Sequence, residues 1–260
     1  MSSWLDTAER PLTADNLALL LDNKIAAIRI AGFASADECE RFAHAAKHGA
    51  MQYYKVREKI GYIGLAQYQY RWDKTKADFF ADVAAAQADV QAVCEQARFD
   101  PLERLLEHLR PLWPAAIGLA QEGGQSYFAG IIRCTSDKID LHADWAPLNS
   151  PDYAIAAIDG QLGWNFFAEQ LLSGGQTTVY HNPWQPQVEP GVIAPSYGLA
   201  RSLTEGVPQI TYEATAGDVV IFNTRNPHEI APGVPRPGGA RISMGSFIGR
   251  MPDRSLVLWA

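Results

Sequence analysis

The pattern of hydrophobic and polar positions divides the chain into two parts near Gly123-Gly124. Before this point apolar residues recur mostly at the three- and four-residue spacing of amphipathic helices, and after it they form short runs separated by glycine and proline. Such short runs are typical of strands in packed sheets. We therefore expect a mainly helical N-terminal part and a β-rich C-terminal part.

Three helices are predicted in the N-terminal part. Ser35 and Glu38 have the spacing of a capping box, which satisfies backbone N–H groups at a helix start, and this helix should end near Lys47. An alanine-rich segment from Lys76 to Arg98 also has helical spacing. In Asp100-Pro101-Leu102-Glu103, an N-cap aspartate followed by proline at the first helical position predicts the start of a third helix.

Strand-like runs occur once in the N-terminal part, at Lys24–Ile30, and eight times in the C-terminal part. The eight runs are residues 126–134, 139–144, 163–169, 176–181, 209–213, 218–223, 241–248 and 256–259. Many short strands at this spacing indicate a sandwich or barrel. We expect an α+β fold in one domain, residues 1–260. Its core would be a cupin-like jelly roll, or double-stranded β-helix, of residues 121–260, and residues 1–120 would be mainly helical support that could include a lid.

Charge and hydropathy narrow the classes of partner. The chain of 260 residues has 22 basic and 29 acidic side chains, a formal net charge of −7, and no Lys/Arg cluster that would neutralise phosphates. Nucleic acid is therefore not an expected partner. No basic leader opens the chain, and no uncharged apolar run approaches the ~18 to 20 residues of a membrane span. We expect a cytoplasmic protein with a small-molecule substrate, and the sequence leaves its oligomeric state open.

A His-x-Asp pair ends one of the predicted strands. In an extended chain, residues two apart point to the same side, so His142 and Asp144 can offer an imidazole nitrogen and a carboxylate oxygen to one point. A further histidine, His228, stands in the loop predicted after the apolar run 218–222. Two histidines and one carboxylate with open coordination positions suit a non-haem iron(II) oxygenase.

An Arg-x-Ser pair follows in the next predicted strand. Arg241 and Ser243 also share a strand face, and a guanidinium with a nearby hydroxyl can bind one carboxylate. A dicarboxylate could therefore chelate iron with its 2-oxo acid end and place its distal carboxylate on this pair. Asn165, a polar residue in an apolar strand, could hydrogen-bond the same co-substrate or a protein neighbour.

With His142-x-Asp144, His228 and Arg241-x-Ser243 in this order, the chain resembles iron(II)/2-oxoglutarate-dependent oxygenases. Residues 121–260 further resemble the branch that contains the carrier-independent halogenases of hapalindole-type alkaloids, and the helical part resembles it only in outline. The segments that carry this second resemblance are residues 124–127, 173–180, 217–222 and 256–259. The resemblance implies Fe(II) held by the three ligands, with 2-oxoglutarate and O2 as co-substrates.

The chain departs from that branch at one position. The halogenases it resembles have glycine where this chain has Asp144, and the glycine leaves a coordination site for chloride. With a carboxylate there, we expect hydroxylation of an unactivated C–H bond rather than chlorination, with succinate and CO2 as co-products. The branch implies a free-standing small molecule as substrate, such as an amino acid derivative or a natural-product intermediate.

Other candidate site residues have open alternatives. Tyr127 could contact the co-substrate and Trp145 the substrate, or both could belong to ordinary barrel packing. The aromatic segment from Met51 to Trp72 could be a lid or irregular packing. His181 could reach a ligand, but a structural position is the favoured interpretation.

Two other classes of protein could use the same ligands. A cupin-like sandwich could hold zinc and hydrolyse its substrate with an activated water. A non-catalytic barrel could bind a metal and a small acid as a sensor. The hydrolase would have no use for Arg241 and Ser243, so this pair favours the oxygenase.

Overall fold

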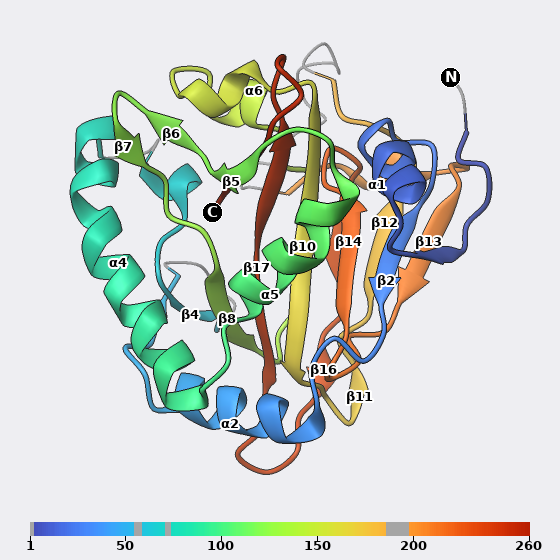
Figure 1. Ribbon diagram of the computed structural model, residues 1–260. Helices are drawn as coiled ribbons and strands as arrows, with labels where there is room; N and C mark the ends of the chain where they lie inside the picture. The colour runs from blue at the N-terminus through green and yellow to red at the C-terminus, as the bar shows by residue number, and fades with distance from the viewer. Residues whose placement is uncertain (1–2, 55–58, 71–73, 186–197) are drawn as a thin grey trace.

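The computed structural model consists of two facing β-sheets, with helices on the outer face of the larger one (Figure 1). It describes residues 3–54, 59–70, 74–185 and 198–260. The centre of the larger sheet has the strand order β14 (Val219–Asn223), β10 (Gly160–Glu169), β17 (Arg241–Arg250), β8 (Ile131–Thr135). The smaller sheet has the order β13 (Gln209–Tyr212), β12 (Thr177–Tyr180), β15 (His228–Ile230), β9 (Ile139–His142). Eight strands shared in this way between two sheets form a jelly roll, as the spacing of the runs predicts.

The N-terminal part contributes strands to the larger sheet in addition to the helices expected in residues 1–120. Beyond β14 lie β2 (Ala27–Ile30) and β1 (Glu9–Pro11), and beyond β8 lie β4 (Gly61–Ile63) and β3 (Gln52–Tyr53). Strand β18 (Leu256–Trp259) pairs with β17 and also with β5 (Ile117–Leu119), a further strand of the N-terminal part. The physical reason is that strands added at a sheet edge pair backbone groups that would otherwise lack partners.

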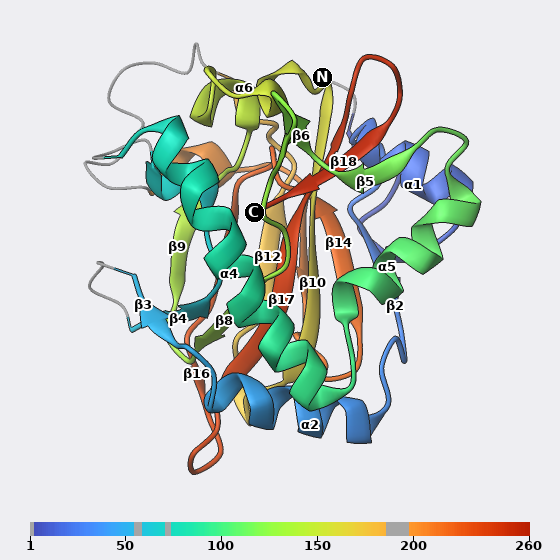
Figure 2. The ribbon, with the colours of Figure 1, turned by 60° about the vertical axis from the view of Figure 1, so that its left-hand side comes forward.

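In the described ranges, four α-helices precede the jelly roll: α1 (Ala14–Leu21), α2 (Ala36–Lys47), α4 (Lys76–Ala97) and α5 (Pro101–Leu109). The capping box of Ser35 and Glu38 starts α2, and the Asp100 side chain caps α5, so both predicted starts are confirmed. Figures 1 and 2 show α2, α4 and α5 over the same face of the larger sheet. Shorter elements of the described residues are α6 (Ala146–Asn149), β6 (Gln121–Glu122), β7 (Gln125–Ser126), β11 (Ser173–Gly174) and β16 (Gly233–Val234). Short 3-10 helices lie at Gln67–Gln69, Arg110–Leu112, Ala154–Ala157 and Arg201–Thr204. No helix in the described ranges is both long and apolar enough to cross a membrane.

Strand β10 is packed on both faces, and this packing positions the residues that face the second sheet. Toward the helices, the ring of Phe166 lies 5.6 Å from Phe42 of α2 and 5.4 Å from Phe99, measured between ring centroids. Because successive side chains of a strand alternate, the adjacent Asn165 and Phe167 face the interior between the sheets. The helical layer therefore fixes one wall of that interior.

We expect Phe42→Ala to lower the free energy of unfolding by about 3–5 kcal/mol, because the ring is fully buried against β10 and its removal leaves a cavity. Urea denaturation followed by circular dichroism measures this change. Leu172→Ala is the matched control, since Leu172 is 60% exposed, and its effect should stay within about 0.5 kcal/mol. Equal effects of the two substitutions would contradict this account of the packing.

Candidate active site

The pairing of β9 with β15 sets two histidines opposite each other. His142 ends β9, His228 begins β15, and the two are direct partners in the antiparallel register, with ring centroids 4.1 Å apart. His228 was expected in a loop and instead lies in a strand. Asp144 follows β9, and its Oδ2 lies 3.7 Å from Nε2 of His142 and 3.6 Å from Nε2 of His228. All three side chains are buried and offer ligand atoms within 4.8 Å of one another, a spacing that suits one metal ion.

Backbone carbonyls select the tautomer of both histidines. The Nδ1 atom of His142 donates to the carbonyl of Asp140 at 2.6 Å, and that of His228 donates to the carbonyl of Asn226 at 2.9 Å. Each Nε2 lone pair is therefore left to face the ligand cluster. Burial, together with the neighbouring His142, lowers the pKa of His228 to about 3, so its imidazole is neutral at physiological pH, the form that binds metals.

Thr224 holds the backbone of Asp144 from two sides. The amide of Asp144 donates to the Thr224 carbonyl at 2.9 Å, and the Thr224 hydroxyl donates to the Asp144 carbonyl at 3.2 Å. Thr224 is 2% exposed, and its methyl group fills the space beside Gly163 of β10, where an added Cβ would lie 2.6 Å from it. This residue was missed because nothing near it in the sequence indicates a partner 80 positions earlier.

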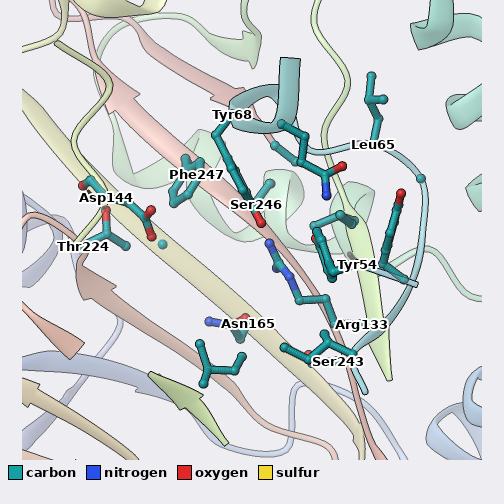
Figure 3. Close-up of a pocket in the computed structure, with 18 of the residues that line it drawn as sticks. Tyr54, Leu65, Tyr68, Arg133, Asp144, Asn165, Thr224, Ser243, Ser246 and Phe247 are labelled. Atoms are coloured by element: carbon teal, nitrogen blue, oxygen red, sulfur yellow. Dashed lines mark hydrogen bonds between the residues drawn. The ribbon is translucent and has the colours of Figure 1, made fainter. Parts of the chain in front are cut away.

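A cavity of about 850 Å³ extends between the sheets and is lined by the three ligands. Asn165 and Ser243 line it as well (Figure 3). Arg241 is a further lining residue. The described part of the aromatic segment 51–72 supplies further wall residues, among them Tyr54, Tyr62 and Tyr68. Trp72, at the end of that segment, lies outside the described residues.

Arg241 and Tyr212 form a donor pair on one wall of this cavity. Arg241 is 4% exposed, its Nη1 lies 3.4 Å from the Gly175 carbonyl, and no carboxylate in the described ranges forms an ion pair with it. Burial lowers the pKa of Arg241 to about 10, which leaves it charged at neutral pH. The Tyr212 hydroxyl is buried without a hydrogen-bond partner among the described residues, and burial raises its pKa, so it keeps its proton.

This donor pair fits an anion. A buried guanidinium and a buried phenol both lose their hydrogen bonds to water. A carboxylate that accepts hydrogen bonds from them would replace those lost bonds. Ser243, on the same strand face as Arg241, adds a third donor. Tyr212 was missed by the sequence analysis, although alternation with Ile210 in the run 209–213 places the two side chains on one buried face.

Asn165 faces the cavity. Its side-chain amide lies so close to the neighbouring strand that the residue beside it has no room for a side chain. Gly245 of β17 is its register partner, and a Cβ added there would lie 2.9 Å from Oδ1 of Asn165 and 2.3 Å from the Trp164 carbonyl. The close approach explains the glycine. Asn165 therefore presents a fixed amide to whatever fills the cavity.

Two of the candidate wall residues, Tyr127 and Trp145, are not among the described residues that line the large cavity. Tyr127 is fully buried, its hydroxyl donates to Glu122, and its ring packs 5.1 Å from that of Phe80. Trp145 is buried with its ring 4.8 Å from the guanidinium of Arg225. Within the described part of the chain, neither side chain is among those that line the large cavity. Both side chains are packed against neighbouring residues, which is the alternative that the sequence left open.

His181 has a structural position as well. Its ring lies edge-on to that of Trp4, with centroids 4.9 Å apart, and it is not among the described residues of the cavity wall. Burial lowers the pKa of His181, which favours the neutral ring in this apolar contact. The favoured interpretation of this histidine agrees with its placement.

Comparison with known proteins gives a match over almost the whole chain. Residues 3–259 match the family model described as the carrier-protein-independent halogenase WelO5. Leucinostatins biosynthesis cluster protein S of Purpureocillium lilacinum is 30% identical over 216 residues, which are 79% of this chain and 88% of that protein. L-gamma-glutamyl-L-propargylglycine hydroxylase of Streptantibioticus cattleyicolor is 32% identical over 165 residues, which are 62% of this chain and 59% of that protein.

Solved structures share the fold at low sequence identity. An N-substituted L-amino acid dioxygenase from Burkholderia ambifaria, in complex with alpha-KG, has a TM-score of 0.62 at 13% identity, covering 95% of this chain and 91% of its own. An oxidoreductase of the 2OG-Fe(II) oxygenase family from Burkholderia pseudomallei has a TM-score of 0.52 at 13% identity, covering 95% of both chains. Because the family model spans nearly the whole sequence, the protein belongs to the family of the carrier-protein-independent halogenase WelO5, within the iron(II)/2-oxoglutarate-dependent oxygenases.

Proposed function

We propose that the protein hydroxylates an unactivated C–H bond of a free-standing small molecule, using Fe(II), 2-oxoglutarate and O2, with succinate and CO2 as co-products. The observation that carries this proposal is the carboxylate of Asp144, which lies within 3.7 Å of Nε2 of both His142 and His228. The halogenases that the chain resembles have glycine at this position. A carboxylate ligand there takes the place that chloride would need.

The three buried ligands fit ferrous iron. Two neutral imidazoles and one carboxylate are the donor set typical of non-haem Fe(II) oxygenases, and a bound iron would supply the oxidative chemistry that a C–H bond requires. The protein's own contribution is to keep both Nε2 lone pairs available, through the carbonyls of Asp140 and Asn226, and to hold Asp144 through Thr224.

The distal carboxylate of 2-oxoglutarate would bind Arg241, Ser243 and Tyr212. In the described part of the chain, Arg241 has no ion-pair partner and the Tyr212 hydroxyl has no hydrogen-bond partner. Burial of both groups is therefore costly by itself, and both line the cavity that contains the iron ligands. Asn165, on the central strand between them and the iron ligands, would donate from its amide to the same co-substrate. This binding site for a carboxylate favours an oxygenase over a zinc hydrolase, because a hydrolase needs no dicarboxylate co-substrate.

Relatives support an amino acid derivative as substrate. One relative acts, by its name, on L-gamma-glutamyl-L-propargylglycine, although the aligned part covers only 59% of that protein. The Burkholderia ambifaria enzyme of the same fold acts on N-substituted L-amino acids. A cavity of about 850 Å³ has room for 2-oxoglutarate together with a molecule of this size.

The reaction is tested by incubating the protein with Fe(II), 2-oxoglutarate, O2 and chloride and a panel of γ-glutamyl and N-acyl L-amino acids. We expect succinate and a hydroxylated product by mass spectrometry, because Asp144 occupies the position that chloride would need. A chlorinated main product would refute the assigned role of Asp144. Tight 2-oxoglutarate binding with no succinate across the panel would instead favour the non-catalytic barrel.

Thr224→Val should weaken Fe(II) binding about tenfold, because the valine keeps the packing beside Gly163 and loses the hydroxyl that holds the Asp144 carbonyl. Anaerobic competition against a chromophoric chelator measures the affinity. Thr224→Ser retains the hydroxyl and should bind iron as the parent protein does. The assignment fails if the valine variant binds iron as tightly as the serine variant.

Tyr212→Phe should raise the dissociation constant for 2-oxoglutarate about tenfold, because it removes one hydrogen bond to a charged carboxylate. Anaerobic titration of the Fe(II) protein with 2-oxoglutarate measures it. Tyr62→Phe is the matched control, since Tyr62 lines the same cavity while its hydroxyl donates to Gln52. Equal affinities of the Tyr212 and Tyr62 variants would show that Tyr212 is no anchor.

A further inference from the structure

The turn between β14 and β15, residues 224–227, holds two of the three candidate iron ligands. In this turn the Thr224 carbonyl accepts from the backbone amide of Asp144 at 2.9 Å. The Asn226 carbonyl accepts from Nδ1 of His228, also at 2.9 Å. A displacement of the turn would therefore disturb both ligands at once.

The C-terminal end of α1, which contacts β14, is hydrogen-bonded to this region at two points (Figure 1). Nδ2 of Asn223, the last residue of β14, donates to the Leu20 carbonyl at 3.3 Å. The side chains of Asn23 and Asn226 form a reciprocal amide pair. Nδ2 of Asn226 donates to Oδ1 of Asn23 at 2.7 Å, and Nδ2 of Asn23 donates to Oδ1 of Asn226 at 3.3 Å. The pair joins two positions that are 203 residues apart in the sequence.

Burial makes the amide pair part of the geometry around His228. Asn226 is 0% exposed, so its side chain cannot exchange the hydrogen bonds to Asn23 for bonds to bulk water. Pro227 follows Asn226 and restricts the backbone of Asn226 to extended conformations. The side chain and the carbonyl of Asn226 start from the same Cα atom. A side chain fixed by Asn23 therefore limits the direction of the carbonyl that accepts from His228.

The backbone conformation of Asn23 makes its side chain informative. Asn23 has a φ of 54°, and it follows α1 in a Schellman motif. In this motif its amide donates to the Leu20 carbonyl, and the amide of Lys24 donates to the Leu19 carbonyl. Glycine is the usual residue at such a position, because it adopts a positive φ without strain. The helix end alone needs no side chain here, whereas the contact with Asn226 needs an amide.

Two further rings contact Asn23. Nε1 of Trp4 donates to Oδ1 of Asn23 at 3.1 Å, and the ring of His181 interacts with the Asn23 backbone. The rings of Trp4 and His181 are themselves in edge contact. Asn23 is thus held by three other residues, and its amide has a defined position from which to hold Asn226.

We propose that Asn23 is a positioning residue for His228 and acts through Asn226. The Asn226 carbonyl keeps the proton of the imidazole on Nδ1 and so leaves Nε2 to the metal. The inference rests on the proposed function, in which His228 binds Fe(II). The hydrogen bond at Nδ1 is a property of the metal-free protein as well, so one measurement of the test needs no iron.

The test compares Asn23→Gly with Asn23→Asp. Glycine suits the helix end but removes the amide, whereas aspartate keeps the Oδ1 acceptor for Asn226 and Trp4. In anaerobic competition against a chromophoric chelator, Asn23→Gly should bind Fe(II) about tenfold more weakly than the parent protein, and Asn23→Asp within about twofold of it. Asn16→Ala is the matched control on α1, because the Asn16 amide donates to the Pro11 carbonyl and not to the turn. It should bind Fe(II) as the parent does.

Proton exchange at Nδ1 of His228 reports on the hydrogen bond to Asn226 itself. NMR of the metal-free protein, labelled at its histidine ring nitrogens, measures this exchange, and the signal is identified by its loss in His228→Gln. We expect faster exchange in Asn23→Gly than in the parent protein, in Asn23→Asp or in Asn16→Ala. A general loss of stability would not separate the variants in this order.

Either of two results would overturn the inference. Equal Fe(II) affinities of Asn23→Gly and the parent protein would show that the turn holds His228 without Asn23. Unchanged Nδ1 exchange in Asn23→Gly, even with weaker Fe(II) binding, would show that Asn23 does not act through the Asn226 carbonyl. If the parent protein binds no Fe(II), the proposed function fails, and the exchange measurement still decides whether Asn23 orients His228.

Discussion

The candidate active site depends on the antiparallel pairing of β9 with β15, because this backbone register sets His142 opposite His228. Directly opposite residues share a sheet face, and a slip by one residue would turn one imidazole away from the other. Strand β12 pairs with β15 on its other edge and fixes the register from that side. The larger sheet then faces the two histidines across the interior and contributes Asn165 and Ser243, so side chains of both sheets line one cavity.

Burial of charge between the sheets links the fold to its ligands. A guanidinium as buried as Arg241 is stable only when hydrogen bonds and opposite charge offset its lost hydration. Its one internal acceptor in the described ranges is the Gly175 carbonyl, and the phenol of Tyr212 beside it is a donor as well. The interior therefore favours an anion at this point, and a carboxylate bound here interacts more strongly than it would at a surface of high dielectric constant.

Local sequence signals predicted the parts of the molecule that depend on local geometry. Alternation along strands placed His142 with Asp144 and Arg241 with Ser243, and the capping box at Ser35 fixed a helix start. Contacts between distant segments left no such signal. The hydrogen bonds between Thr224 and Asp144, and the strands that residues 1–120 add to the sheet, depend on contacts between residues far apart in the sequence. Trp145 was assigned to the site because it follows Asp144 directly, but α6 begins immediately after it, and Trp145 is not among the described residues that line the large cavity.

The two hydrogen bonds between Thr224 and Asp144 bear on the proposed choice between hydroxylation and chlorination. Both hydrogen bonds between Thr224 and residue 144 use backbone atoms of residue 144, its amide and its carbonyl. The position of this residue beside the two histidines is therefore independent of its side chain. With aspartate, the side chain itself reaches the metal position, as the distances of 3.6 and 3.7 Å to the imidazoles indicate. With glycine, as in the halogenases that the chain resembles, the same backbone would leave that position to an external anion. The proposed choice of hydroxylation over chlorination therefore depends on the side chain at position 144, because the backbone hydrogen bonds that hold this residue do not involve that side chain.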